Sequence, residues 1–228
     1  MTQLTNNKQP DEMKFFFDFD STFIQSETLD DLAQILITQG KCEARVLDQI
    51  ANITSQAMAG GLDFYQSLVA RLALLPFEEA DLHHLIEVLS DKISHSIAAN
   101  QAWFLAHAKD TYIISGGFKE IIVPVVARFG IHADHVFANE FREGKLLEDN
   151  PLAYSNGKAQ VIKELMSDKE GPVVLVGDGY TDYEVKEQGV ADYFLAYAEN
   201  VKRQSVISKA DYVIHSFDDL QHALKELK

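Results

Sequence analysis

Two aspartates stand one residue apart where an apolar run ends. The run Lys14–Asp18 leads into the sequence DFDST, which holds Asp18 and Asp20. Side chains alternate along an extended chain, so Asp18 and Asp20 are predicted to face the same side. Two carboxylates that face one way repel each other unless a cation or a shared proton lies between them. Mg²⁺ prefers oxygen ligands of this kind. The same pair could equally be two solvated acids at the end of a strand.

A second pair of aspartates follows another apolar run. Val173–Gly177 leads into GDGYTD, which places Asp178 and Asp182 on either side of a glycine-containing turn. These carboxylates could bind a metal ion. Alternatively, Asp178 could be an ordinary turn residue and Asp182 a helix cap.

A glycine turn and a lysine between these pairs could both bind an anion. Ser115, Gly116 and Gly117 end the apolar run that begins at Thr111, and glycine amides at a strand-to-helix turn can approach an anion closely. Lys158 begins a helical pattern, where its charge opposes the helix dipole. Taken alone, two glycines more often form only a tight turn, and such a lysine is more often an exposed side chain. Together, the segments supply a nucleophile, anion donors, a cation and metal-binding acids.

The elements that must position these residues alternate between strands and helices. Strands are predicted at Lys14–Asp18, Thr111–Ser115, Val173–Gly177 and Asp192–Leu195, and helices at Gly117–Arg128, Asn156–Met166 and Asp182–Gln188. This alternation predicts an α/β fold with a Rossmann-like, mostly parallel sheet. Because such sheets bind ligands at the carboxyl ends of their strands, the four segments are expected to meet there.

The stretch between the first two strands shows only helical patterns, over Thr28–Gln39, Glu43–Met58, Asp63–Leu75 and Glu78–Ile97. These helices exceed what one crossover between strands requires. We therefore predict a helical-bundle cap over residues 26–97, inserted into a catalytic core formed by residues 14–25 and 98–228. Residues 1–13 are predicted to be a flexible tail, and Asn139–Leu147 a short hairpin.

The bulk composition narrows the class of partner. The formal net charge of −15 argues against nucleic acid or an anionic membrane as a partner, because binding either needs a basic face. The sequence also lacks an apolar run of the ~18 residues that span a bilayer. A single cysteine, Cys42, forbids an internal disulfide and fits a cytoplasmic protein. A small anionic substrate is still compatible with this net charge, but it would need a local positive site. The composition does not indicate the oligomeric state.

With these motifs in place, the sequence resembles the haloacid-dehalogenase superfamily, and best its phosphoserine phosphatase branch. DFDST, ISGG, a lone lysine that begins a helix, and GDGxTD carry the resemblance, which extends from Lys14 to the C-terminus. Members of the branch also have a glutamate after the first motif and an arginine in a cap helix of the form FxxSLxxR. Here these are Glu27 and Arg71. Thr181 stands where many relatives have asparagine.

The resemblance implies Mg²⁺-dependent hydrolysis of a small phosphorylated substrate, O-phosphoserine, to serine and phosphate, as in serine biosynthesis. Asp18 would form an aspartyl-phosphate, and Asp20 would act as general acid and base. Asp18, the backbone carbonyl of Asp20 and Asp178 would hold Mg²⁺, and Asp182 would orient Lys158 or a water. The residues implied in substrate binding are Glu27, Arg71, Ser115, Gly116, Gly117, Lys158 and Thr181.

The residue types of Glu27 and Arg71 fit a zwitterionic substrate. Arg71 shares a helical stripe with Phe64 and Leu68, which directs its guanidinium toward the inner side of the cap. A guanidinium matches a carboxylate, and Glu27 would attract an ammonium group. Alternatively, Glu27 and Arg71 pair with each other.

Two other functions remain open at this point. The enzyme could act on another phosphomonoester or transfer the phosphoryl group to an alcohol such as homoserine. The chain could also be a receiver-like signalling domain, although the phosphorylated aspartate of a receiver ends a middle strand and the comparable strand here ends in Ser115.

Overall fold

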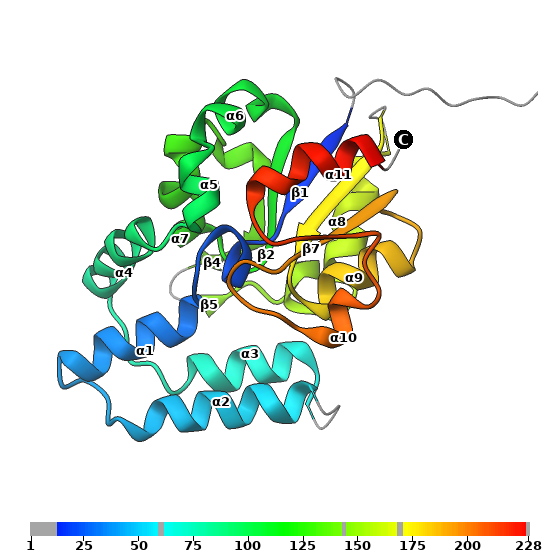
Figure 1. Cartoon of the computed structure of the whole chain (residues 1–228). Helices are drawn as coiled ribbons and strands as arrows, with labels where there is room; N and C mark the ends of the chain where they lie inside the picture. The colour runs from blue at the N-terminus through cyan, green and yellow to red at the C-terminus, as the bar shows by residue number, and fades with distance from the viewer. Residues whose placement is uncertain (1–12, 59–61, 143–144, 168–170, 227–228) are drawn as a thin grey trace, which may run out of the picture.

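In the computed structural model, which describes residues 13–58, 62–142, 145–167 and 171–226, six parallel strands form a central sheet (Figure 1). Its order is β3-β2-β1-β6-β7-β8, and every neighbouring pair is parallel. The strands are β1 (Lys14–Phe17), β2 (Thr111–Phe118), β3 (Val136–Asn139), β6 (Val173–Gly177), β7 (Tyr193–Tyr197) and β8 (Tyr212–Ile214). The α/β architecture predicted from the sequence is confirmed.

Helices cover both faces of the sheet, and β1 shows why. Its side chains alternate, so Phe15 and Phe17 enter one hydrophobic core while Phe16 enters the other. The first core is covered by α6 (Gln101–Ala106), α7 (Lys119–Val126) and α11 (Leu220–Glu226), and the second by α8 (Gly157–Leu165) and α9 (Tyr180–Glu187). A strand buried on both faces reads as a continuous apolar run, which is what made β1 recognisable in the sequence.

A helical insertion, defined here as α1 to α4, separates β1 from β2. Its helices are α1 (Thr28–Thr38), α2 (Arg45–Met58), α3 (Phe64–Leu72) and α4 (Glu79–Asp91). Figure 1 shows α1, α2 and α3 together on one side of the sheet, away from the chain termini. The two linkers of the insertion pair with each other, through an antiparallel bridge between Ile24 and Ile93. The backbone N–H of Gln25 also donates to the Lys92 carbonyl at 2.8 Å.

The pairing of Ile24 with Ile93 explains one difference from the sequence-based prediction. A single helix was expected over Glu78–Ile97, but the structure has α4 and then a separate short helix, α5 (His95–Ala99). The break falls where Ile93 leaves helical geometry to pair with the first linker. α5 contacts η7 (Phe217–Asp219), which belongs to the C-terminal part of the chain.

Other strand and helix boundaries also differ from those predicted from the sequence. β3 and β8 were not predicted, and β2 continues through Gly117 and Phe118 because Phe118 pairs with Asn139. The helix expected from Gly117 therefore begins at Lys119. The predicted hairpin is present as β4 (Phe141–Arg142) and β5 (Lys145–Leu146), which pair antiparallel, while its tip, Glu143 and Gly144, lies outside the described residues. Apart from Met13, the predicted N-terminal tail also lies outside the described residues.

The remaining short elements are the π-helical turn η2 (Phe19–Phe23), α10 (Gln204–Ile207), η3 (Ala108–Asp110), η4 (Ala127–Phe129), η5 (Ala133–His135) and η6 (Pro151–Ala153). None of the described helices combines the length and the apolar character that crossing a membrane requires.

Candidate active site

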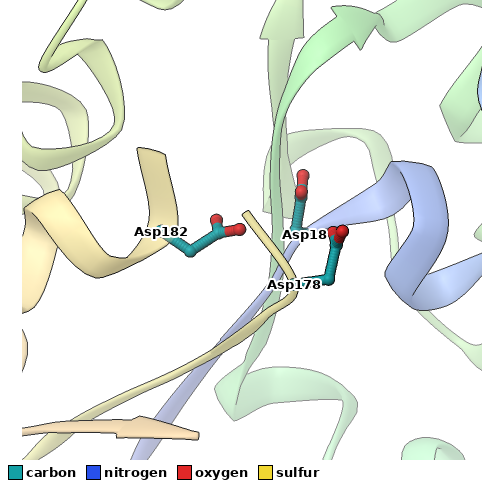
Figure 2. A group of neighbouring side chains, drawn as sticks. All are labelled: Asp18, Asp178 and Asp182. Atoms are coloured by element: carbon teal, nitrogen blue, oxygen red, sulfur yellow. The ribbon is translucent and has the colours of Figure 1, made fainter. Parts of the chain in front are cut away.

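Three aspartates converge at the carboxyl edge of the sheet (Figure 2). Asp18 directly follows β1, and Asp178 directly follows the neighbouring strand β6. Asp182 lies in the first turn of α9. One carboxylate oxygen from each aspartate lies within 4.8 Å of the other two. Residues that are far apart in the sequence are thus close in space because β1 and β6 are adjacent and parallel, with Phe17 opposite Val176.

Lys158 is the buried cation beside these acids. Its ammonium lies 2.8 Å from Asp18 Oδ1 and 2.7 Å from Asp182 Oδ1. Burial alone would lower the pKa of Lys158, but the charges of Asp18 and Asp182 outweigh it and raise that pKa above its ordinary value. Lys158 is therefore held in its charged form. It sits in the first turn of α8, where the helix dipole disfavours a cation, so the two aspartates are what retain it there.

Asp182 also explains the glycines of GDGYTD. A side chain at Gly177 would place its Cβ 2.2 Å from Asp182 Cγ, so only glycine fits beside this carboxylate. The other oxygen of Asp182 accepts the backbone N–H of Gly179 at 3.0 Å. Burial, followed by the charge of Asp18, raises the pKa of Asp182 to about 7, although Lys158 opposes the shift. Thr181 precedes Asp182 in the same first turn.

Asp20 is not a member of the group of three. After Asp18 the chain leaves the strand and forms the turn η2, so the strand-like alternation expected for Asp18 and Asp20 does not extend this far. Asp20 Oδ1 instead accepts from the backbone N–H of Thr28 at 2.8 Å and from its hydroxyl at 2.5 Å. Burial raises the pKa of Asp20 well above its usual value, and the charges of Glu27 and Asp18 act in the same direction.

The turn that carries Asp20 contains a strained residue. Ser21 has a φ of 55°, in the left-handed region, which costs a non-glycine residue about 1–3 kcal/mol and persists only when neighbours hold it. Its N–H donates to the Ser26 carbonyl at 3.0 Å, and its hydroxyl donates to Glu27 at 2.7 Å. The conformation after Asp20 is therefore imposed by contacts outside the turn.

The Ser115–Gly117 segment forms a bulge within β2 rather than a turn after it. The pairing of β2 with β3 shifts register between Ile114 and Phe118. Ser115 is buried, and its hydroxyl accepts the N–H of Gly117 at 2.9 Å. A Cβ at Gly116 would lie 2.8 Å from the ring of Phe64, and one at Gly117 would lie 3.5 Å from Asp20 Oδ2. Glycine at position 116 thus lets α3 approach this segment closely, whereas the distance from Gly117 to Asp20 is that of an ordinary contact.

Glu27 and Arg71 do not pair with each other. Glu27 accepts the Ser21 hydroxyl and lies 3.4 Å from Arg203 Nη2. Among the described residues Arg71 forms no ion pair, and its Nε donates to the Ser67 carbonyl at 3.2 Å. Burial lowers the pKa of Arg71, opposed by the charges of Glu27, Asp20 and Asp30. The Arg71 guanidinium is therefore a half-buried cation that faces acids without contacting one.

Arg203 is a site residue that sequence reasoning missed. Its Nε donates to Asp178 Oδ2 at 2.7 Å, and its Nη2 approaches Glu27. It follows β7 and therefore lies at the same edge of the sheet as Asp18 and Asp178. No local motif marks it. The one available signal was its place in the chain, shortly after a predicted strand.

The donor set fits a hard divalent cation. Asp18 and Asp178 offer carboxylate oxygens within 4.8 Å, the type of ligand that Mg²⁺ prefers. Burial, followed by the negative charge of Asp18, raises the pKa of Asp178, as expected for two neighbouring buried acids. A cation bound between Asp18 and Asp178 would relieve the repulsion between their negative charges.

Comparison with known proteins agrees with this geometry. A family model described as haloacid dehalogenase-like hydrolase matches residues 15–186. The phosphoserine phosphatase of Bos taurus is 34% identical over 218 residues, which cover 92% of each chain. A phosphoserine phosphohydrolase-like protein from Francisella tularensis superposes with a TM-score of 0.78 at 27% identity, covering 92% of this chain and 98% of that one. A substrate-bound phosphoserine phosphatase complex superposes with a TM-score of 0.70 at 25% identity. The match covers 97% of this chain and 100% of that one.

The chain therefore belongs to the haloacid dehalogenase-like hydrolase family, in its phosphoserine phosphatase branch. The resemblance identified from DFDST, ISGG, Lys158 and GDGYTD is confirmed. A receiver-like signalling domain is excluded by this membership, and β2, the strand comparable to the one that ends in a receiver's phosphorylated aspartate, carries Ser115 instead.

Proposed function

We propose that the protein hydrolyses O-phosphoserine to serine and phosphate through an aspartyl-phosphate on Asp18. The observation that carries the proposal is the convergence of Asp18, Lys158 and Asp178 at one edge of the sheet. Arg71 adds a guanidinium that makes no ion pair among the described residues. The phosphoserine phosphatases similar to this chain support the choice of substrate.

The contacts of Asp18 suggest which of its oxygens attacks phosphorus. Asp18 Oδ1 accepts the N–H of Phe19 at 2.8 Å and also contacts Lys158. Oδ2 is left as the nucleophile, because its lone pairs are not used by these donors. Attack by Oδ2 forms the new P–O bond as the bond between phosphorus and the serine oxygen breaks. Lys158, Ser115 and the Gly116 amide are proposed to bind the phosphoryl oxygens, with Thr181 at the start of α9.

Asp20 is proposed to transfer the proton. Its raised pKa favours a protonated carboxyl group, which can donate to the departing serine oxygen. Because Oδ1 already accepts two hydrogen bonds from Thr28, Oδ2 is the oxygen that would carry the proton. The resulting carboxylate can then accept a proton from the water that hydrolyses the aspartyl-phosphate.

Mg²⁺ would be held by Asp18, Asp178 and the backbone carbonyl of Asp20, where it would supply positive charge beside the phosphoryl group. EDTA is expected to abolish phosphate release, and added Mg²⁺ to restore it. A second readout needs no substrate. Mg²⁺ at 100 times its dissociation constant should stabilise the fold by about 2.7 kcal/mol, which a thermal melt would detect. Activity that survives chelation, or a midpoint unchanged by Mg²⁺, would contradict the metal proposal.

The helical insertion is proposed to act as the cap, over about the predicted residues 26–97. Phe64 on α3 contacts Gly116, and Tyr65 stacks on Tyr154 of the core with ring centroids 5.2 Å apart. α3 therefore contacts the core beside the anion-binding bulge, and it also carries Arg71. We further propose a cytoplasmic location, in keeping with a single cysteine.

Arg71→Ala tests the choice of substrate. Loss of a charge-assisted contact with the substrate carboxylate is expected to raise KM for phosphoserine about 10- to 100-fold, equivalent to about 1.5–3 kcal/mol. KM for p-nitrophenyl phosphate, which has no carboxylate, should stay nearly unchanged. Arg45→Ala is the matched control, because Arg45 is an exposed arginine of the same insertion, paired with Glu43 at 3.0 Å. An equal change for both substrates would remove Arg71 from recognition.

A panel of phosphomonoesters tests the proposal as a whole. Phosphoserine and phosphoethanolamine, which lacks a carboxylate, would be compared by the phosphate they release. Phosphoserine is expected to have the higher kcat/KM, because only its carboxylate can meet Arg71. Faster hydrolysis of phosphoethanolamine, or no hydrolysis of phosphoserine, would overturn the substrate assignment.

A further inference from the structure

The side chain of Asn200 holds the turn that carries Asp20. Asn200 lies in the loop after β7, and its Nδ2 lies 3.1 Å from the Ser21 carbonyl, 3.4 Å from that of Thr22 and 3.2 Å from that of Ile24. The same nitrogen lies 2.6 Å from Ser94 Oγ. An amide nitrogen has two hydrogens, so these four acceptors share two donors. The carbonyl oxygens of one turn thus converge on a single side chain.

This convergence matters because of Ser21. Ser21 directly follows Asp20 and has a left-handed backbone conformation, which persists only when its surroundings hold it. Asn200 donates to the Ser21 carbonyl itself. The backbone on the C-terminal side of Asp20 is therefore fixed from outside the turn, by a residue almost two hundred positions away in the sequence.

Asn200 also reaches the other linker of the helical insertion. Ser94 follows Ile93, which pairs with Ile24. The Ser94 hydroxyl donates to the Thr22 carbonyl at 2.6 Å, and its N–H donates to the Phe23 carbonyl at 3.0 Å. One amide thus connects the turn η2 to both linkers.

We propose that Asn200 is a positioning residue, which aligns Asp20 for proton transfer by fixing the turn η2 and the two linkers of the insertion. Asn200 acts through Asp20. This inference rests on the proposed function, because it requires Asp20 to be the general acid.

The dependence of rate on the leaving group separates this role from a merely structural one. Phenolate is a stronger base than p-nitrophenolate, so the departure of phenol needs protonation by Asp20 far more. Phenyl phosphate and p-nitrophenyl phosphate have neither an ammonium nor a carboxylate group, so Glu27 and Arg71 do not distinguish them. A misplaced Asp20 should slow phenyl phosphate more than p-nitrophenyl phosphate, whereas general destabilisation should slow both alike.

The test is Asn200→Ala, assayed with both esters at saturating Mg²⁺. General acid catalysis is worth about 10²–10⁴-fold, so partial loss of alignment should lower kcat/KM for phenyl phosphate about 10- to 100-fold and for p-nitrophenyl phosphate less than about threefold. Asn100→Ala is the matched control. Asn100 Nδ2 donates to the Ser96 carbonyl at 2.8 Å and to Asp218 at 2.7 Å, away from the turn. The Asn100→Ala substitution should leave the ratio of the kcat/KM values for the two esters unchanged.

Ser94→Ala provides a second variant if Asn200→Ala fails to fold, which a thermal melt would reveal. Ser94→Ala removes one acceptor of the Asn200 amide and the hydroxyl that donates to the Thr22 carbonyl. It should also lower kcat/KM for phenyl phosphate more than for p-nitrophenyl phosphate. An equal loss for both esters in the folded variants, or no loss for either, overturns the inference. Failure of the unaltered protein to release phosphate from phosphoserine as well as from both esters would instead overturn the proposed function.

Discussion

Asp18→Asn is expected to abolish phosphate release from phosphoserine, with kcat reduced at least about 10⁴-fold, the scale seen when a covalent nucleophile is removed. The carboxamide keeps the size of the side chain and an oxygen for the Phe19 N–H, but it lacks the anionic oxygen that attacks phosphorus. Folding should be retained, because Asn can still accept from Phe19. The measurement is released phosphate in single and multiple turnovers.

The covalent intermediate gives this prediction a direct readout. Borohydride reduces an acyl phosphate to an alcohol, so trapping during turnover should convert residue 18, and no other aspartate, to homoserine, detectable by mass spectrometry. Asp110→Asn is the matched control, because Asp110 is also buried and pairs with Lys14 at the start of β1. A fully active Asp18→Asn protein, or label on a different aspartate, would overturn the assignment of Asp18.

The sequence predicted the centre of the sheet better than its edges. β1 and β6 are buried on both faces and end at aspartates, so their apolar runs and stop signals were both visible. β3 and β8 are short edge strands, of four and three residues. A short edge strand needs little apolar periodicity, and what defines it is pairing with a distant partner. The break between α4 and α5 was hidden for the same reason, because Ile93 leaves helical geometry to pair with Ile24.

The residues of the candidate site also fall into two groups, those that the sequence could predict and those that it could not. Asp18, Asp178 and Lys158 follow strands or begin helices, and parallel topology brings such positions to one edge. The direction of Asp20 could not be predicted, because it depends on the turn η2 and on donors from Thr28. Arg203 lies in an irregular loop after β7. It is a site residue only because its side chain contacts Asp178, which is distant in the sequence. Local sequence patterns indicate periodicity, but they do not indicate contacts between side chains that are distant in the sequence.

The charges of the site also explain how an acidic protein can receive an anion. The chain has a formal net charge of −15, yet Lys158, Arg71 and Arg203 lie near the acids at this edge. Lys158 and Arg203 are each in contact with a carboxylate, so they reduce the repulsion that a phosphate would meet. Arg71 makes no ion pair among the described residues, so its charge is available to an anion, as the proposed function requires.

Lys158→Met is the second change with a large expected effect. Methionine keeps much of the length of the lysine side chain but removes the only positive charge that contacts both Asp18 and Asp182 in the described structure. Loss of one preorganised group that stabilises transition-state charge costs about 10²–10³ in kcat, and a loss of this size or larger is expected here. The variant should also be less stable by about 3 kcal/mol without Mg²⁺, because two buried carboxylates lose their partner.

The pH dependence of stability supplies a readout that is independent of activity. The pKa of Asp182 is raised to about 7 even with Lys158 present, so the folded protein retains a proton that the unfolded chain releases at lower pH. The contribution of Asp182 to stability therefore falls as pH rises toward 7, and without Lys158, which opposes the shift, this fall should extend above pH 7. Lys41→Met is the matched control, because Lys41 contacts Asp81 at 2.7 Å in the helical insertion. If Lys158→Met kept the kcat of this control while losing stability, Lys158 would neutralise Asp18 and Asp182 without binding phosphate.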